Sequence, residues 1–322
     1  MRQMKRIGVL ILIAAASLHA SVMQQKPDPQ GVPPQSTVKV GVDLVNVLFS
    51  VSDRKGHFVP GLTYRDFTVE EDGKKQNIRY FSREADQALT LGLLIDVSPS
   101  VKSVFDEERI AAVRFLDSVL RPKDLAMVIG FEKTVTLYGD LTEDKRLLED
   151  SIRDLRLGPV MDGGTSMFDA LYLASKEKLR EEVGRKAIIL ITDGQDTTSK
   201  VQANEAMVAI HESDSVIYSI AIAPEWRTTF TRLGLGSGPN TSALRRLSEE
   251  TGGRMFYVHE SSEFEPVFTR INEELRNQYS LAYVSTNTDK DGKFRKIRIV
   301  PRDSNYRINA RKGYFAAKAP TQ

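Results

Sequence analysis

Five oxygen-bearing side chains at three places in the sequence could together hold a metal ion. Three of them form the pattern Asp96-Val-Ser98-Pro-Ser100, at the carboxyl end of an apolar run. Thr165 follows in the segment DGGTS, and Asp193 follows in ITDGQD at the end of another apolar run. Two carboxylates and three hydroxyls are hard donors, which suit Mg²⁺, or Mn²⁺ or Ca²⁺ in its place, with waters retained. Imidazole and thiolate, the donors that favour zinc, are missing from this set.

Asp, Ser and Thr also gather in loops simply because they form turns and helix caps. For any one of the three motifs alone, that role in turns and caps would be favoured. For the five groups together, a metal site is favoured, provided that the fold brings them to one place.

Signals of catalysis are missing. The sequence has no GxSxG, Walker or HExxH motif,. His57, His211 and His259 fall in separate expected elements without metal-ligand spacing, so we expect them to be surface or structural residues. A haloacid dehalogenase-like phosphatase would need a second carboxylate where Ser98 stands. The glycine-rich segment 234–240 lacks the Lys of a phosphate-binding loop,. We therefore expect neither an enzyme nor a small-molecule substrate.

The elements that must position these groups alternate between strands and helices. Apolar runs at 89–96, 125–131, 186–193 and 215–223 suit strands buried on both faces,. Helix-like stretches fall near 104–120, 143–155, 168–180, 203–213 and 241–250, with Thr142 and Asn240 as expected N-caps, and a last one spans 264–277,. This order predicts a doubly wound, mostly parallel α/β sheet, in which sites form beyond the carboxyl ends of the strands.

Two β-rich segments, 37–85 and 278–316, flank the α/β block. Both show period-two apolar alternation, as in Phe67/Val69 and Ile297/Ile299,. Either segment alone would leave unpaired edges and a half-covered apolar face. We therefore expect the two segments to pair into one small β-sandwich.

The first residues favour export. Residues 1–20 place Arg2, Lys5 and Arg6 ahead of an apolar run too short to span a bilayer, which predicts a cleaved signal peptide,. Residues 21–36 are rich in Pro and Gln and predict a disordered linker,. The chain has no Cys, hence no lipid-anchoring thiol and no disulfide. We expect a secreted or periplasmic product without an integral membrane segment.

Net charge argues against a nucleic-acid partner. Residues 1–20 hold three of the 45 basic residues and none of the 43 acidic ones, so their removal leaves 42 against 43, or net −1. The basic stretch 292–302 alternates with apolar residues and is better interpreted as a strand with one solvated face,.

Across residues 88–277 the sequence resembles the von Willebrand factor A-type domain with its metal-ion-dependent adhesion site, whose pattern is DxSxS, then Thr, then Asp. The flanking phrases VPGLTYRDFTVEEDGKKQ and RKGYFA are similar to those of secreted bacterial proteins with this domain. The resemblance implies that Ser98 and Ser100 ligate the ion directly, that Asp96 and Asp193 do so directly or through water, and that Thr165 joins or leaves with the domain's conformation. It also implies that the helix 264–277 shifts on binding, although a static packing helix is an equal expectation.

The function expected is that of an exported, divalent-cation-dependent adhesion protein. Its metal ion would accept an Asp or Glu carboxylate from a protein partner. The alternative is a structural or assembly component of the cell envelope, in which the metal only stabilises the fold.

Overall fold

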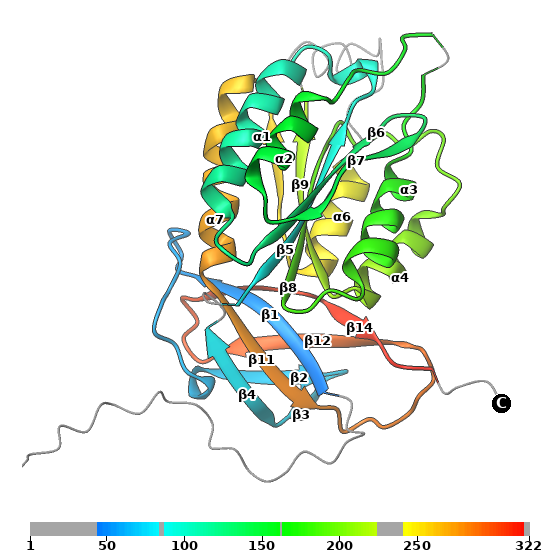
Figure 1. The fold of residues 1–322 in the computed structure, drawn as a ribbon. Coiled ribbons are helices and arrows are strands. Elements are labelled where there is room, and N and C mark those ends of the chain that lie inside the picture. Colours follow the sequence, from blue (N-terminus) through cyan, green and yellow to red (C-terminus); the bar gives the residue numbers. More distant parts are fainter. Residues whose placement is uncertain (1–43, 84–86, 162, 224–240, 319–322) are drawn as a thin grey trace, which may run out of the picture. The chain divides into compact units, whose positions relative to one another are not determined.

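Six strands form the sheet that carries the predicted site (Figure 1), in the order β10-β9-β8-β5-β6-β7. Neighbouring strands are parallel, except that β7 runs antiparallel to β6. β5 and β9 are buried at every position, as their continuous apolar runs require in a sheet covered on both faces,. The bounds are β5 Leu89–Asp96, β6 Leu125–Phe131, β7 Val135–Thr142, β8 Arg185–Thr192, β9 Ser215–Ile222 and β10 Met255–Val258.

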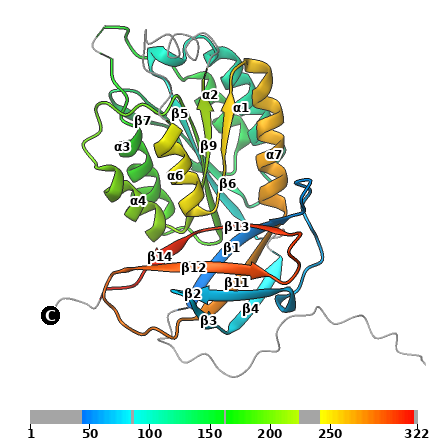
Figure 2. The same cartoon turned by 180° about the vertical axis from the view of Figure 1, so that it is seen from behind.

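Helices cover both faces of this sheet (Figures 1 and 2). One core joins α1, α2 and α7 to the β5 face that carries Leu91 and Leu93, and another joins α3, α4 and α6 to the opposite face, where Leu94 lies. The bounds are α1 Phe105–Val119, α2 Lys145–Arg153, α3 Met167–Tyr172, α4 Ala203–Glu212, α6 Thr241–Thr251 and α7 Phe264–Arg276. The expected doubly wound, mostly parallel α/β fold is confirmed.

The computed structural model describes residues 44–83, 87–161, 163–223 and 241–318. Contacts divide the chain into Met1–Gln30 and Gly31–Gln322, and every described residue belongs to the second unit. The signal peptide and linker predicted for 1–36 lie outside the described residues, as do the N-cap predicted at Asn240 and the glycine-rich segment. Within the described ranges, no helix is both long and apolar enough to cross a membrane.

The flanking segments form two four-stranded sheets, in the orders β13-β1-β11-β4 and β14-β12-β2-β3. Both sheets mix the two ends of the chain: Val47 of β1 pairs with Leu281 of β11, and Val69 of β2 pairs with Ile299 of β12, all antiparallel. Their inward faces share one apolar core. The bounds are β1 Leu44–Ser52, β2 Phe67–Glu71, β3 Lys74–Gln76, β4 Ile78–Arg83, β11 Gln278–Val284, β12 Phe294–Pro301, β13 Arg307–Ala310 and β14 Gly313–Phe315.

A buried carboxylate ties the two sheets of the sandwich together. Glu71 of β2 is 2% exposed, and its Oε2 accepts hydrogen bonds from the Tyr283 hydroxyl of β11 at 2.8 Å and the Tyr314 hydroxyl of β14 at 3.0 Å. Because β2 and β11 belong to different sheets, these bonds fix their relative position as well as satisfying a charge that would be costly to bury alone.

The chain leaves and re-enters the sandwich at neighbouring strands. β4 precedes the α/β block, β11 follows it, and the two pair with Arg83 opposite Tyr279. The joint is held by Glu274 of α7, which is fully buried and accepts hydrogen bonds from Ser50 Oγ at 2.6 Å, Arg254 Nε at 2.7 Å and Asn309 Nδ2 at 2.9 Å.

Some local predictions were wrong. Thr142 is not an N-cap but the last residue of β7, and the cap of α2 is Asp144, whose Oδ1 accepts from Arg146 N at 2.9 Å. The helix expected at 168–180 is divided into α3 and a π-helical segment, Leu173–Leu179. The edge strands β7 and β10 were not predicted, because only one residue of β10 and none of β7 is buried.

Candidate metal centre

Asp96 ends β5 and is fully buried. Its Oδ2 accepts a hydrogen bond from Thr192 Oγ1 at 2.6 Å, and its Oδ1 accepts from Ser98 N at 2.9 Å. Thr192 is the last residue of the neighbouring strand β8, so the carboxylate is oriented by both its own loop and the adjacent strand.

The two serines lie side by side where the loop turns toward solvent. Pro99 begins a single 3₁₀ turn that spans Pro99–Val101, and its fixed φ suits this first helical position,. The hydroxyl oxygens of Ser98 and Ser100 are 2.8 Å apart. Ser98 is 4% exposed and Ser100 is solvent-exposed, so the two hydroxyls lie between the buried carboxylate of Asp96 and solvent.

Asp193 and Thr165 are brought to the same edge of the sheet by different loops. Asp193 directly follows β8 and is 1% exposed, with Oδ1 accepting from Gln195 N at 3.1 Å. Thr165, 6% exposed, lies just before α3. Its backbone N donates to Thr197 Oγ1 at 2.9 Å and its carbonyl accepts from Thr197 N at 2.8 Å. The Thr165 loop is therefore fastened to the loop that carries Asp193.

Further hydrogen bonds fix the Thr165 loop from its other side. Ser166 donates its backbone N to Glu132 O at 2.6 Å and its Oγ to Lys133 O at 2.9 Å, just beyond β6. The Oγ of Ser166 also lies 2.8 Å from Thr198 Oγ1. The loops after β6 and β8 thus hold the Thr165 loop between them, which positions a side chain that no regular element carries.

The electrostatics of the centre favour a bound cation. The pKa of Asp96 is raised to about 6, first by burial and also by the charge of Asp193, although hydrogen bonds from Ser98 and Thr192 oppose the shift. Glu108 of α1 is fully buried, and neither of its carboxylate oxygens has a hydrogen-bond partner among the residues that the structure describes. Burial and then the charge of Asp96 raise the pKa of Glu108 well above its usual value. A divalent ion beside these acids would offset both the desolvation and the mutual repulsion.

The donor set fits a hard ion. Within the described ranges, no group of three or more His, Cys, Asp or Glu is placed to hold a metal, so the candidate centre depends on its hydroxyls as well as its two carboxylates. The histidines lie elsewhere: His57 contacts Asp53 at 3.3 Å, His211 packs against Phe294, and His259 is 2.7 Å from Ala223 O.

Two contributors were missed from the sequence. Thr192 stands directly before Asp193, but its hydroxyl turns back onto Asp96, a pairing that only the strand register reveals. Glu108 had a usable signal, because it lies at helical spacing from the buried residues Phe105 and Ala112 and so occupies the apolar stripe of α1,.

Comparison with known proteins identifies relatives of the α/β block. The family model of the von Willebrand factor type A domain matches residues 91–270. No curated protein matches the chain. Among solved structures, the mussel byssus proximal thread matrix protein 1 with a zinc-occupied MIDAS motif has a TM-score of 0.50 at 17% identity, covering 63% of this chain and 49% of that chain. The match thus spans about half the length of the mussel protein and shows a shared fold.

Two bacterial structures are similar at a lower score. The conserved hypothetical protein BatB from Bacteroides thetaiotaomicron has a TM-score of 0.47 at 18% identity, covering 59% of this chain and 100% of that chain. A von Willebrand factor type A protein from Catenulispora acidiphila has a TM-score of 0.47 at 11% identity, covering 88% of this chain and 76% of that chain.

Proposed function

Because this chain belongs to the von Willebrand factor type A domain family, we propose that it is an exported adhesion protein that binds a protein partner through a divalent cation. Domains of this family mediate protein–protein interactions and commonly hold a divalent metal. The chain's own ligands would be Asp96, Ser98, Ser100, Thr165 and Asp193.

The observation that carries the proposal is the placing of the serine pair. Ser98 and Ser100, with their hydroxyls 2.8 Å apart, lie between a buried carboxylate and solvent. An ion held there would keep much of its positive charge, because three of its five protein ligands are neutral. A bound ion of this kind supplies an electrophilic centre that takes a further carboxylate as a ligand. An Asp or Glu side chain of a protein partner is the ligand that we propose.

Mg²⁺ is the ion we propose, with Mn²⁺ or Ca²⁺ as substitutes, since all five donors are oxygen atoms. The mussel structure holds zinc at its MIDAS motif. We place less weight on zinc here because the donor set of this chain has neither imidazole nor thiolate.

We also propose that the site binds rather than catalyses. The hydroxyls of Ser98 and Ser100 face each other, and the carboxylate that Ser98 contacts, Asp96, is also held by Thr192 and would itself be a metal ligand rather than a free base,. Export is supported by the basic and apolar pattern of residues 1–20,. N-terminal sequencing of the exported protein would locate the cleavage.

The test is calorimetric titration of Mg²⁺ and Mn²⁺ into the protein and into a variant with Ser98→Ala and Ser100→Ala. We expect binding to the native protein and none to the variant. Ser100 is exposed but Ser98 is 4% exposed, so the melting temperature of the variant in chelator is the control for its folding. Equal binding to both proteins, or none to the native protein at millimolar metal, would overturn the proposed centre.

A second function, that of a structural component of the cell envelope whose metal only stabilises the fold, is favoured by one observation. Asp96 is fully buried and joins β5 to β8 through Thr192. The variant Asp96→Ala separates the two functions. Loss of partner binding with an unchanged melting temperature supports adhesion. A fall in melting temperature that appears only when metal is present supports the structural role, because the variant then lacks the stabilisation that the metal gives the native protein.

A further inference from the structure

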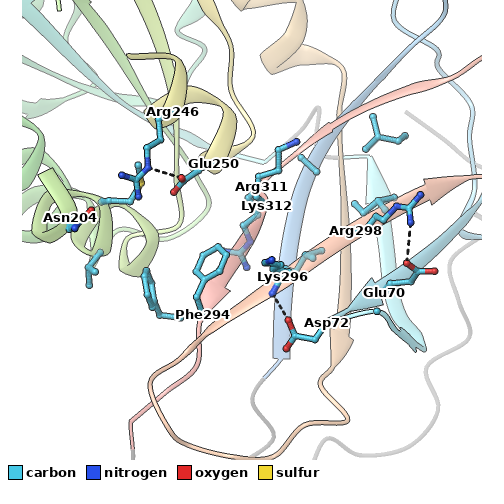
Figure 3. A pocket seen from close by; sticks show the side chains of 18 residues that line it. Glu70, Asp72, Asn204, Arg246, Glu250, Phe294, Lys296, Arg298, Arg311 and Lys312 are labelled. Carbon is cyan, nitrogen blue, oxygen red and sulfur yellow. Dashed lines mark hydrogen bonds and ion pairs between the residues drawn. The ribbon is translucent and has the colours of Figure 1, made fainter. Parts of the chain in front are cut away.

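A groove lies between the α/β block and the sandwich, and none of the five predicted metal ligands lines it. Its volume is about 990 Å³, the upper end of the range for small-molecule sites,. Helices α4 and α6 form one wall, and strands β12, β13 and β14 form the other (Figure 3). The groove is thus a separate feature, for which the metal centre does not account.

Part of the groove wall is aromatic and aliphatic. Phe294 of β12 and Phe315 of β14 meet edge to face, with ring centroids 5.2 Å apart. Met207 and Val208 of α4 line the groove from the helical side. His211 packs against both phenylalanine rings and is itself 7% exposed, so it supports the two rings on the protein side. Such a wall suits a hydrocarbon ligand.

Most charged side chains at the groove are already paired. Arg246 Nε is 2.8 Å from Glu250 Oε1, and Arg298 is 3.8 Å from Glu70, as Figure 3 shows. Arg311 pairs with Asp214 outside the groove.

Two ammonium groups remain without an ion pair. Lys296 and Lys312 are both exposed, and neither has a salt-bridge partner within the described ranges. Asp72 adjoins Lys296, but its Oδ1 accepts from the backbone N of Lys296 at 2.9 Å rather than from the side chain. The backbone of Lys312 lies beside that of Lys296, because Ile297 N, the next residue along β12, donates a hydrogen bond to Lys312 O at 2.8 Å. The groove lining therefore holds two lysines, and one carboxylate, Asp72, that have no ion pair within the described ranges, which leaves a net positive charge beside an apolar wall.

We propose that this groove binds a single-chain organic anion, a fatty carboxylate whose chain lies against Phe294 and Phe315 and whose head group is held by Lys296 and Lys312. A peptide would fit less well, because its backbone would need hydrogen-bonding partners in the groove. β12 pairs with β14 at Phe294–Lys296 and with β2 at Ile297–Pro301, so part of its backbone on each side is already bonded. A hydrocarbon body needs no such partners, and both lysines line the same groove, so either can supply donors to the carboxylate,.

The experiment uses laurate as the probe, titrated calorimetrically into the whole protein below its micelle concentration. Dodecyltrimethylammonium, with the same chain length and the opposite charge, is the matched probe. We expect laurate to bind at one site and the cation to bind at least about tenfold more weakly, because the rim carries unpaired positive charge.

The variant Lys296→Ala/Lys312→Ala should weaken laurate binding about tenfold, the loss of two partly exposed charge contacts. The control Lys55→Ala/Lys102→Ala removes two exposed lysines that do not line the groove and should change nothing. All four side chains are exposed, so equal melting temperatures are expected for both variants. Equal affinity of the two variants for laurate, or equal affinity of the native protein for the two probes, would overturn the proposal.

Two further arms distinguish the groove from a membrane-binding surface and from the metal centre. Vesicles of phosphatidylglycerol should not sediment the protein, and sedimentation without laurate binding would replace the fatty carboxylate with a membrane surface and so overturn the proposal. The variant Ser98→Ala/Ser100→Ala should bind laurate as the native protein does. The proposal for the metal centre and the proposal for the groove can therefore be disproved independently of each other.

Discussion

Ser50 Oγ donates a 2.6 Å hydrogen bond to Glu274 Oε1, although the two residues lie 224 positions apart in the sequence. Ser50 belongs to β1 of the sandwich, and Glu274 belongs to α7, the last helix of the α/β block. Both side chains are buried, and the same carboxylate also accepts from Arg254 and Asn309. One buried carboxylate of the α/β block therefore accepts from two donors of the sandwich, Ser50 and Asn309, as well as from Arg254.

Replacement of this carboxylate should weaken the joint. Glu274→Gln keeps the shape of the side chain but turns one acceptor into a donor that faces other donors. We expect a loss of about 2 kcal/mol in the free energy of unfolding, measured by denaturant titration. The matched control is Glu273→Gln, whose side chain is 53% exposed and pairs only with Arg270. If the two variants were equally stable, the joint would not depend on Glu274.

Metal affinity should fall in acid. Protons and the metal compete for Asp96, whose pKa in the metal-free protein is raised to about 6 by burial. Below that pH, binding has to displace a proton, so affinity should fall by up to about tenfold for each pH unit. Titrations of Mg²⁺ at pH 5, 6 and 7 would measure the slope. An affinity that does not change between pH 5 and 7 would remove Asp96 from the ligand set.

Without metal, the same group makes the protein more stable in mild acid. The folded pKa of Asp96, about 6, lies above the ordinary value of 3.8, so the folded state holds more protons between these two values. Its contribution to stability is present at low pH and is lost as pH rises from about 3.8 through about 6, by an amount of order 3 kcal/mol,. With a chelator present, the free energy of unfolding of Asp96→Asn should change less between pH 5 and 7 than that of the native protein. An equally steep native and variant profile would contradict this assignment.

His211 should act in the opposite direction. Its ring is buried against Phe294 and Phe315, its Nε2 has no hydrogen-bond partner in the described part of the chain, and burial lowers its pKa to about 4. The unfolded state therefore binds a proton first, and stability falls as pH drops from about 6.5 toward 4. His211→Phe should retain the ring contacts and remove this loss, as melting temperatures at pH 4.5 and 7 would show. A variant as acid-sensitive as the native protein would assign the loss to another group.

Gly164 should matter for the position of Thr165. A Cβ at Gly164 would lie 2.5 Å from Thr198 Cγ2, and Thr198 N donates to Thr165 O at 3.1 Å. Gly164→Ala should therefore displace this contact and weaken metal binding by about tenfold, as changes behind a ligand commonly do. Gly163→Ala is the neighbouring control, because its Cβ would come no closer than 3.1 Å to any atom. If calorimetry gave the two variants the same metal affinity, the contact between Thr198 and Thr165 would not control metal binding.

Much of the architecture was predictable because burial on both faces leaves a continuous apolar run. β5 and β9 carry such runs, and both were placed to within one residue. The sandwich followed from period-two alternation at both ends of the chain, since neither segment could cover its own apolar face. β7 and β10 escaped prediction because they are edge strands, whose residues are mostly half-exposed. Edge strands leave a weak pattern in sequence.

Four of the candidate ligands could be named in advance because their loops follow the buried strands β5 and β8, and Thr165 could be named from the motif pattern, but their supports could not. Thr192 faces Asp96 only because β5 and β8 pair in one register, and no spacing within the chain encodes that. Glu274 presents the same limit: its three donors come from distant segments. Whether the five ligands hold a metal stays a prediction, for which titration with Mg²⁺ and Mn²⁺ is the test.

The pairing of β1 with β11 also has a consequence for synthesis. A chain made from its N-terminus produces β1 to β4 long before β11 and β12, their partners across the sheet, exist. Until then those strands carry unpaired edges, the features through which nascent chains aggregate. The α/β block has all its own strands in between, so we expect it to fold first and the sandwich to close last. Chaperones should therefore be needed mainly by the first strands made.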